Sequence, residues 1–243
     1  MRSGNPVLKS DTFDIAPVGA RMTLGGTVNK TAILLALLLI TAGATWGRFY
    51  DNAGNPAAIM PLVWGGCIGG FIVALVTIFK KEWAGITAPI YALLEGLVVG
   101  GLSAIFEAAY PGIVIQAVGL TFGTLAALLL AYKSGLIKAT ENFKLGVVAA
   151  TGGIALLYLA NIVMSLFGHP IGFIHESGPL GIAFSGFVVV IAALNLVLDF
   201  DFIESGAENG APKHMEWYGA FGLTVTLIWL YIEILRLLSK LRK

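Results

Sequence analysis

Two acidic residues near the C-terminus are the strongest candidates for chemistry in this chain. Asp199 ends the apolar run "LNLVLDFDFIE", and Glu233 lies near the middle of the next run, within "LYIEILRLL". Carboxylates at membrane depth are costly and rare, and they usually mark a functional site. If the two acids met across neighbouring helices, they would share a proton and titrate as a coupled pair. Gaining or losing that proton would change the link between the helices, so the pair would act as a pH switch.

Three further polar residues could support such a site. Asn195 lies one helical turn before Asp199 on the same face, where it could hydrogen-bond into the same site. Asp201 adds a second carboxylate two residues later. Glu95, within "YALLEGLVVGG", lies far from either end of its apolar run and has no basic neighbour at helical spacing. Asp201 and Glu95 are therefore candidates for attracting cations along a path through the membrane.

Each member of the acid pair also has a structural interpretation. Asp199 could be the polar end of its helix at the membrane interface, and Glu233 could form a local ion pair with Arg236, three residues on. Helix length adds a difficulty, because Glu233 lies 16 residues past Trp217, which is roughly 24 Å of helix. The acids can meet only if one helix extends beyond its apolar run, for example with a helix that begins near Pro212.

The composition indicates what kind of protein must position these residues. Of 243 residues, 57% are hydrophobic and 12% are charged, whereas a soluble domain carries about 25% charged residues. The apolar runs are continuous rather than alternating, so they predict helices and not a membrane barrel. We therefore predict an all-α, polytopic membrane helix bundle. The net charge of +1 gives no electrostatic case for nucleic acid, and the single cysteine, Cys67, excludes an intramolecular disulfide and a Cys-based metal cluster.

Seven apolar runs approach the length of about 20 residues that spans a bilayer. Residues 1–30 are polar and lack the apolar core of a signal peptide, so they predict a flexible cytoplasmic tail before a transmembrane domain over 31–243. The first run is short, and we expect its helix to begin around Val28. The predicted spans are Thr31–Trp46, Ala57–Phe79, Ala84–Phe106, Ile113–Tyr132, Leu145–Phe167, Leu180–Leu198 and Trp217–Leu238.

The distribution of lysine and arginine predicts the orientation. With the N-terminus in the cytoplasm, ten basic residues fall on the inner side and only Arg48 falls in the outer connections. The basic end of the chain, Arg236 to Lys243, would then lie outside, against the rule. Small residues also recur four apart, a spacing that lets helix backbones approach closely in lipid and so favours a tightly packed bundle. The pairs are Gly65/Gly69, Gly66/Gly70, Gly96/Gly100 and Gly119/Gly123.

The C-terminal residues resemble a known family. "LVLDFDFIE", a polar turn and "EWYGAFGLTVTLIWLYIEILRLL" resemble the end of the Bax inhibitor-1-like membrane proteins, the transmembrane Bax-inhibitor-motif superfamily. Members typically end their sixth span with an aspartate followed by Thr-Gln, and carry a Tyr-Leu-Asp-Ile type sequence in the seventh. Here Asp199 stands at the first aspartate, followed by Phe200 and Asp201, and Glu233 in "YIEI" replaces the second. The segments "SGNPVLKSDTF" and "MTLGGTVNKTAILL" are similar to a bacterial branch.

The resemblance implies seven transmembrane helices with the seventh central, a cytoplasmic N-terminus and, for the bacterial branch, the inner (plasma) membrane. It also implies a pH-sensitive calcium leak governed by an acid pair between the sixth and seventh helices. Asp199 and Glu233 would then be the pH sensor and gate, and would offer oxygen ligands to calcium, which prefers six to eight of them. Calcium would be the transported or bound ion, and no cofactor is indicated.

Two other classes of function stay open. The chain could be a non-conducting membrane protein that binds and modulates a membrane protease or another partner, with residues 199–216 and the N-terminal tail as docking surfaces. It could also be a proton-coupled secondary transporter, although no internal repeat of the kind common in transporters is visible. An enzyme is not expected, because the sequence has no G-x-S-x-G, no H-E-x-x-H and no phosphate loop.

Overall fold

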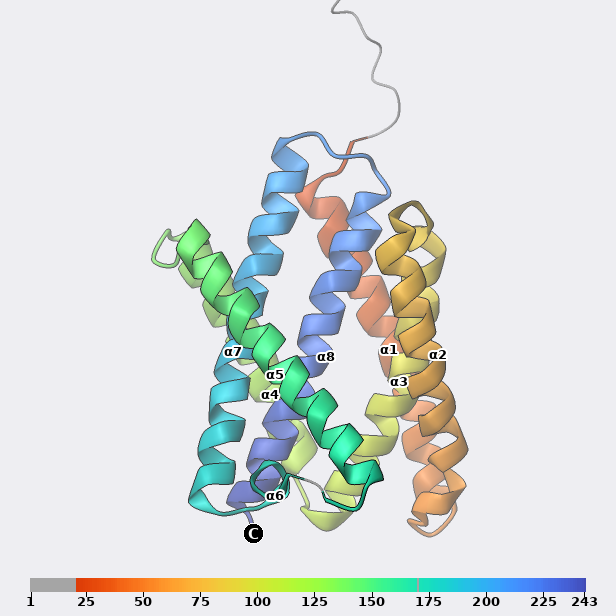
Figure 1. Cartoon of the computed structure of the whole chain (residues 1–243). Helices are drawn as coiled ribbons and strands as arrows, with labels where there is room; N and C mark the ends of the chain where they lie inside the picture. Colours follow the sequence, from red (N-terminus) through yellow and green to blue (C-terminus); the bar gives the residue numbers. More distant parts are fainter. Residues whose placement is uncertain (1–20, 170) are drawn as a thin grey trace, which may run out of the picture.

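Long helices dominate the part of the chain that the computed structural model describes, residues 21–169 and 171–243. Seven of these helices are long and apolar enough to cross a membrane, which confirms the predicted all-α polytopic bundle (Figure 1). A four-residue helix, α6 (Gly172–His175), lies in the connection before α7, and single 3-10 turns precede α2 and α3. The spanning helices are α1 (Leu24–Asp51), α2 (Met60–Phe79), α3 (Ala84–Ala109), α4 (Ile113–Lys133), α5 (Glu141–Leu166), α7 (Pro179–Glu208) and α8 (Met215–Leu241).

Two helices extend well beyond their apolar runs. Helix α1 begins at Leu24 rather than near Val28, because the hydroxyl of Thr23 accepts a hydrogen bond from the backbone N–H of Gly26 and caps the helix. Helix α7 continues through the polar residues after Asp199 and ends just before Gly210, whose φ of +66° is the left-handed conformation that stops helices. The predicted flexible tail lies mostly outside the described residues, since the structure describes the chain only from residue 21.

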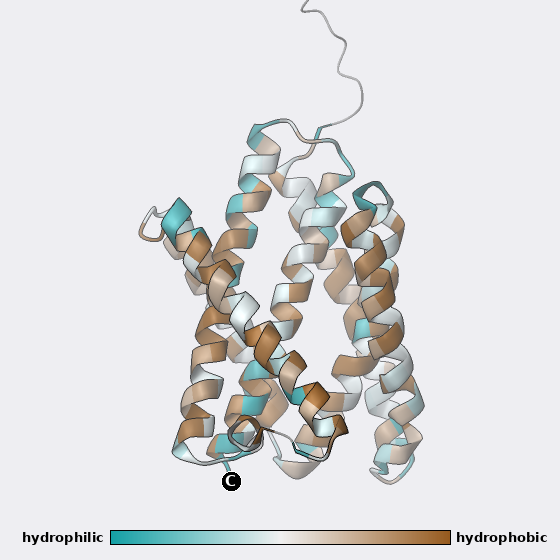
Figure 2. Cartoon of the chain, in the orientation of Figure 1, coloured by the Kyte–Doolittle hydropathy of each residue, from teal (hydrophilic) through white to brown (hydrophobic). Residues whose placement is uncertain are grey.

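Helix α8, the seventh spanning helix, lies at the centre of the bundle, as expected. It packs against α1, α3, α4 and α7, and it has the largest buried share of the seven. Helix α2 packs mainly on α3, and α5, which crosses the bundle diagonally in Figure 1, packs mainly on α7. Hydrophobic residues cover most of α2 and α5, while hydrophilic residues gather toward the helix ends (Figure 2). This distribution is what a bundle surrounded by lipid requires, because apolar side chains can then face outward.

Close helix contacts depend on some of the predicted glycines and not on others. A Cβ at Gly96 would lie 2.3 Å from the carbonyl oxygen of Leu38, and one at Gly100 would lie 2.2 Å from that of Ala42. Helices α1 and α3 therefore touch backbone to backbone along this stripe, as small-residue spacing allows. At Gly119 and Gly123, by contrast, an added Cβ would meet no described atom within 4 Å. Their spacing on α4 does not mark a helix contact.

The two ends of the described chain lie at opposite ends of the bundle. The start of α1 is tied to the loop between α7 and α8 by a hydrogen bond of 2.7 Å from the N–H of Met22 to the carbonyl of Ala211. The C-terminus follows α8 at the other end (Figure 1). The chain therefore makes an odd number of passes through the bundle, and the region around Asp199 lies in the half that contains the start of α1.

Candidate functional site

The register of the antiparallel helices α7 and α8 decides what Asp199 faces. Helix α7 continues nine residues past Asp199 to Glu208, and α8 starts at Met215. A position nine residues into α8 therefore lies at the same depth, near Thr224. The structure agrees: the Oδ1 atom of Asp199 would lie 3.9 Å from a Cβ at Gly222, and its carboxylate interacts with the side chain of Thr226.

One oxygen of Asp199 has no partner. Oδ2 is buried and accepts no hydrogen bond from any described residue. The side chain also borders a polar cavity of about 610 Å³ between α5, α7 and α8, in the half of the bundle near the start of α1. Asn195 and Asp201 line the same cavity, so the structure brings together three of the predicted residues. An acceptor left unsatisfied away from water is costly, and such groups in native proteins call for an explanation.

The other charged groups of this cavity are paired with each other. Lys144 of α5 lies 2.9 Å from Asp201 and 3.3 Å from Glu141, so its ammonium group is already shared between two carboxylates. The amide of Asn195 donates 2.8 Å hydrogen bonds to the hydroxyl of Thr151 and to the carbonyl of Ile191. Asn195 therefore joins α7 to α5 rather than satisfying Asp199. Asp199 is left as the one cavity-lining carboxylate, among the described residues, that has no basic partner.

Glu233 does not meet Asp199, so the predicted acid pair is wrong for this structure. Glu233 is only 2% exposed; its Oε1 accepts hydrogen bonds of 2.9 Å from Arg236 and of 2.9 Å from the hydroxyl of Tyr158 on α5. The same Arg236 nitrogen lies 2.7 Å from the Tyr158 oxygen, which closes a three-membered polar cluster. Glu233 lies seven residues past Thr226, about 10 Å further along α8. The alternative interpretation, a local ion pair with Arg236, is the one that the structure confirms.

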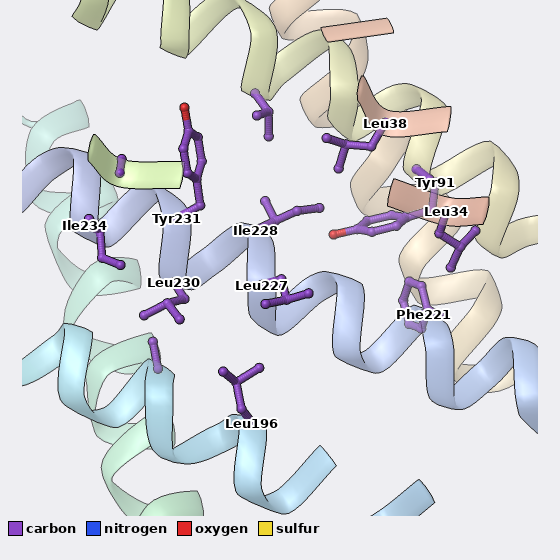
Figure 3. Close-up of a cluster of buried hydrophobic side chains, with 14 of the residues drawn as sticks. Leu34, Leu38, Tyr91, Leu196, Phe221, Leu227, Ile228, Leu230, Tyr231 and Ile234 are labelled. Atoms are coloured by element: carbon purple, nitrogen blue, oxygen red, sulfur yellow. The ribbon is translucent and has the colours of Figure 1, made fainter. Parts of the chain in front are cut away.

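An apolar layer separates the two acids. Leu196 on α7 and Leu230 on α8 are fully buried, and Leu227 is nearly so. Figure 3 shows Leu230 pointing toward the helix that carries Leu196, within the main buried cluster of the bundle. Leu196 precedes Asp199 by about one turn, and Leu230 follows Thr226 by about one turn. Polar groups therefore lie on both sides of a dry layer, with Asp199 on one side and Glu233 on the other.

Glu95 belongs to neither polar region. Its Oε1 would lie 2.8 Å from a Cβ at Gly70, which places the carboxylate against α2 at the α2–α3 contact. It does not line the cavity that contains Asp199. The structure therefore gives no support for Glu95 as a cation-attracting group on the same path. No cluster of three or more His, Cys, Asp or Glu residues able to hold a metal occurs in the described parts of the chain.

A buried acid that the sequence did not single out holds α1 to α8. Glu216 is 0% exposed and accepts hydrogen bonds of 2.9 Å from both the N–H and the hydroxyl of Thr23. It also forms ion pairs with Lys30 and, at 2.8 Å, with Lys213. A negative charge at the N-terminus of α1 is favourable because the helix dipole and free N–H groups point there. In the sequence, only the three-residue spacing between Lys213 and Glu216 could have indicated that Glu216 forms an ion pair.

Two basic side chains at the C-terminal end of the chain, the buried Lys240 and the exposed Arg242, bind other parts of the bundle. Lys240 lies near the end of α8, where its ammonium group donates hydrogen bonds to the carbonyls of Ile174 and Gly181 and to the hydroxyl of Ser185 at 2.8–3.0 Å. Arg242 donates to the carbonyl of Pro111 at 2.9 Å and to Gln116 at 2.8 Å. Two of the basic residues at this end therefore bind helix ends and loops of the bundle itself.

The fold and the site define a polytopic helical membrane protein in which a buried carboxylate lies between a cavity with polar side chains and an apolar layer. The chain belongs to the Bax inhibitor 1 like family, because the model of that family matches residues 5–243. This match confirms the family that the C-terminal motifs resemble. The comparisons with curated proteins and with solved structures gave no match.

Proposed function

We propose that this protein is a pH-sensitive cation leak channel, with calcium as its ion, and that the structure corresponds to its closed state. The observation that carries the proposal is the buried Oδ2 of Asp199, which has no hydrogen-bond partner and lies beside a polar cavity. Next to Asp199 along α7 and α8 lies the buried apolar layer of Leu196, Leu227 and Leu230. Hydrophobic constrictions gate channels by excluding water, so this layer is the gate.

Asp199 is the proton sensor in this mechanism. A neutral carboxylic acid is tolerated in a dry contact, whereas a carboxylate without a hydrogen-bond partner is costly there. Loss of the proton therefore favours an arrangement in which α7 and α8 separate and water reaches the carboxylate. Because Asp199 lies one turn from Leu196, the same separation would wet the apolar layer. The leak is expected to rise with pH.

The charges around Asp199 support this assignment. Lys144 on α5, Asp201 on α7 and Tyr218 on α8 line the same cavity. Lys144 is held by Asp201 and Glu141, so it does not neutralise Asp199 directly. On α8 itself, the contacts of Asp199 are the uncharged Gly222 and Thr226. The charge at the α7–α8 contact therefore changes when Asp199 gains or loses its proton.

Calcium is the favoured ion because the cavity offers oxygen donors. Carboxylates of Asp199 and Asp201 and the amide of Asn195 line it, and calcium prefers oxygen ligands. Glu233 has a different role from the one first expected. It anchors α5 to α8 through Tyr158 and Arg236 on the far side of the gate.

The membrane placement forms part of the proposal. The end of the bundle that holds the start of α1 carries most of the lysines and arginines, so we place it in the cytoplasm. The bacterial inner membrane is the proposed location, and the proposed role is not enzymatic. Two observations together would instead favour a partner-binding role: a second membrane protein that co-purifies in stoichiometric amount, and liposomes that stay ion-tight when they contain this protein. Uphill calcium accumulation driven by a pH gradient would favour a coupled transporter.

Calcium flux into liposomes loaded with a calcium-sensitive dye tests the proposal. We expect wild-type flux to rise with pH by up to about tenfold per unit, the limit for one linked proton. Asp199→Asn keeps the size of the side chain but cannot ionise, so its flux should stay near the acidic wild-type level at every pH. The matched control is Glu95→Gln, which removes a carboxylate from the α2–α3 contact and should keep the pH dependence. Identical pH profiles for wild type and Asp199→Asn would refute the sensor assignment.

A further inference from the structure

A second cavity lies on the other side of α8, within the membrane-spanning part of the bundle. It has a volume of about 290 Å³ and is bounded by α1, α3, α4 and α8. Its walls are almost entirely aliphatic or aromatic, with Leu38 and Val99 on one side and Ile228 on the other. The hydroxyls of Ser103 and Tyr231, which are 2.6 Å apart, face each other at its inner wall and satisfy one another. An occupant therefore needs no polar group.

The cavity is continuous with the surface that faces lipid. Leu39 on α1 and Phe122 on α4 both line it, and they are 64% and 45% exposed. Both belong to helices that span the membrane, so the medium at this opening is hydrocarbon and not water. Apolar cavities of about 150 Å³ are large enough to bind benzene. A void of twice that size beside fluid acyl chains loses dispersion contacts unless a chain enters it.

We propose that this cavity binds one acyl chain of a membrane lipid, inserted laterally between α1 and α4. The chain contacts Ile228 and Tyr231, which lie on α8 on the face away from α7; Figure 3 shows Tyr231 and Leu230 pointing to opposite sides of this helix. The occupant therefore supports the central helix on the face that points away from α7. The inference does not depend on the proposed leak, because it rests on the shape and lining of the cavity alone.

Two glycines give a matched pair of variants. Gly43 lines the cavity on its exposed side, and a Cβ at this position would meet no described atom within 4 Å, so Gly43→Phe adds a ring at the opening of the cavity without a backbone clash. Gly119 on α4 is equally open and does not line the cavity, so Gly119→Phe adds the same ring elsewhere in the membrane region.

Photo-crosslinking in liposomes provides the test. The probe is a phosphatidylcholine with a diazirine within one acyl chain, and mass spectrometry of peptides locates the labels. Ser103 and Tyr231 are 5% and 8% exposed, so lipids that merely surround the bundle do not reach them. We expect wild type and Gly119→Phe to be labelled at both residues, and Gly43→Phe to lose this labelling by roughly tenfold. Labelling of the lipid-facing Leu130, 69% exposed, should be equal in all three proteins and reports correct insertion.

Three outcomes would overturn the proposal. The first is wild-type labelling confined to lipid-facing residues. The second is labelling of Ser103 and Tyr231 that Gly43→Phe leaves unchanged. The third is a different hydrophobic molecule that co-purifies in equimolar amount and excludes the probe, which would show a dedicated ligand site and not a lipid-chain site.

Discussion

Replacing each acid by its amide should change stability in opposite directions. Asp199→Asn removes a carboxylate whose buried oxygen has no partner, whereas Glu233→Gln removes a carboxylate that Arg236 and Tyr158 both bind. Two acids that formed a coupled pair would instead respond alike. The contrast therefore separates the arrangement seen in the structure from the one that the family motif predicts.

The magnitudes follow from the environments. An unsatisfied buried group costs about 1–3 kcal/mol, and the amide retains part of that cost, so Asp199→Asn should stabilise the protein at alkaline pH by about 1 kcal/mol. Breaking a buried ion pair costs about 3–5 kcal/mol. Arg236 is 36% exposed and regains some hydration, so Glu233→Gln should destabilise by a smaller amount, about 2–3 kcal/mol.

The free energy of unfolding can be measured by titration with sodium dodecyl sulfate in mixed micelles, with tryptophan fluorescence as the signal. Wild type and both variants should be compared at the same alkaline pH. The acidic limit serves as a control, because a protonated Asp199 resembles asparagine and the difference between wild type and Asp199→Asn should shrink there. A loss of stability in Asp199→Asn equal to that in Glu233→Gln would refute the reasoning.

Three further predictions concern the ends of the bundle. Gly26→Ala should destabilise by about 1–3 kcal/mol in the same titration, because its Cβ would lie 2.1 Å from an oxygen of Glu216, whereas Gly25→Ala, with no described atom within 4 Å, should be neutral or slightly stabilising. Lys240→Met should destabilise by about 1–3 kcal/mol, because it removes the donor that the carbonyls of Ile174 and Gly181 share with the hydroxyl of Ser185. An equal effect of the substitution Lys243→Met would argue against this role. The third prediction concerns topology and uses single cysteines in a Cys67→Ser background. A membrane-impermeant maleimide should label Lys138→Cys and Lys243→Cys from opposite sides of the membrane. Labelling of both from one side would contradict seven crossings.

The general architecture could be predicted because it depends on local composition. Continuous apolar runs predicted the seven spanning helices, and the spacing of Glu233 and Arg236 allowed the ion pair that forms. The family could be predicted for the same reason, since its motifs are contiguous in the sequence. The contact between α1 and α3 at Gly96 and Gly100 also follows from a local spacing.

The acid pair failed because hydropathy does not set the register of two helices. Helix α7 does continue past its apolar run, as a contact between the acids requires, but Asp199 lies nine residues before its end at Glu208, whereas Glu233 lies 18 residues past the start of α8 at Met215. That extension sets the register with α8 and places Thr226, not Glu233, beside Asp199. Glu216 was missed for a different reason: its partner Thr23 is 193 residues away in the sequence, so no spacing pattern reveals the contact.

The most direct test of the gate is the access of water to Leu230. In the Cys67→Ser background, Leu230→Cys places a single thiol in the apolar layer, and its reaction with a small, charged, water-soluble thiol reagent can be followed in liposomes. The proposed mechanism predicts a slow reaction at acidic pH. As the pH rises, the reaction rate should increase by up to about tenfold per pH unit beyond the increase that thiol ionisation alone causes. This extra increase should be lost when Asp199→Asn is added. A rate that follows thiol ionisation alone, with or without Asp199, would contradict a gate opened by this carboxylate.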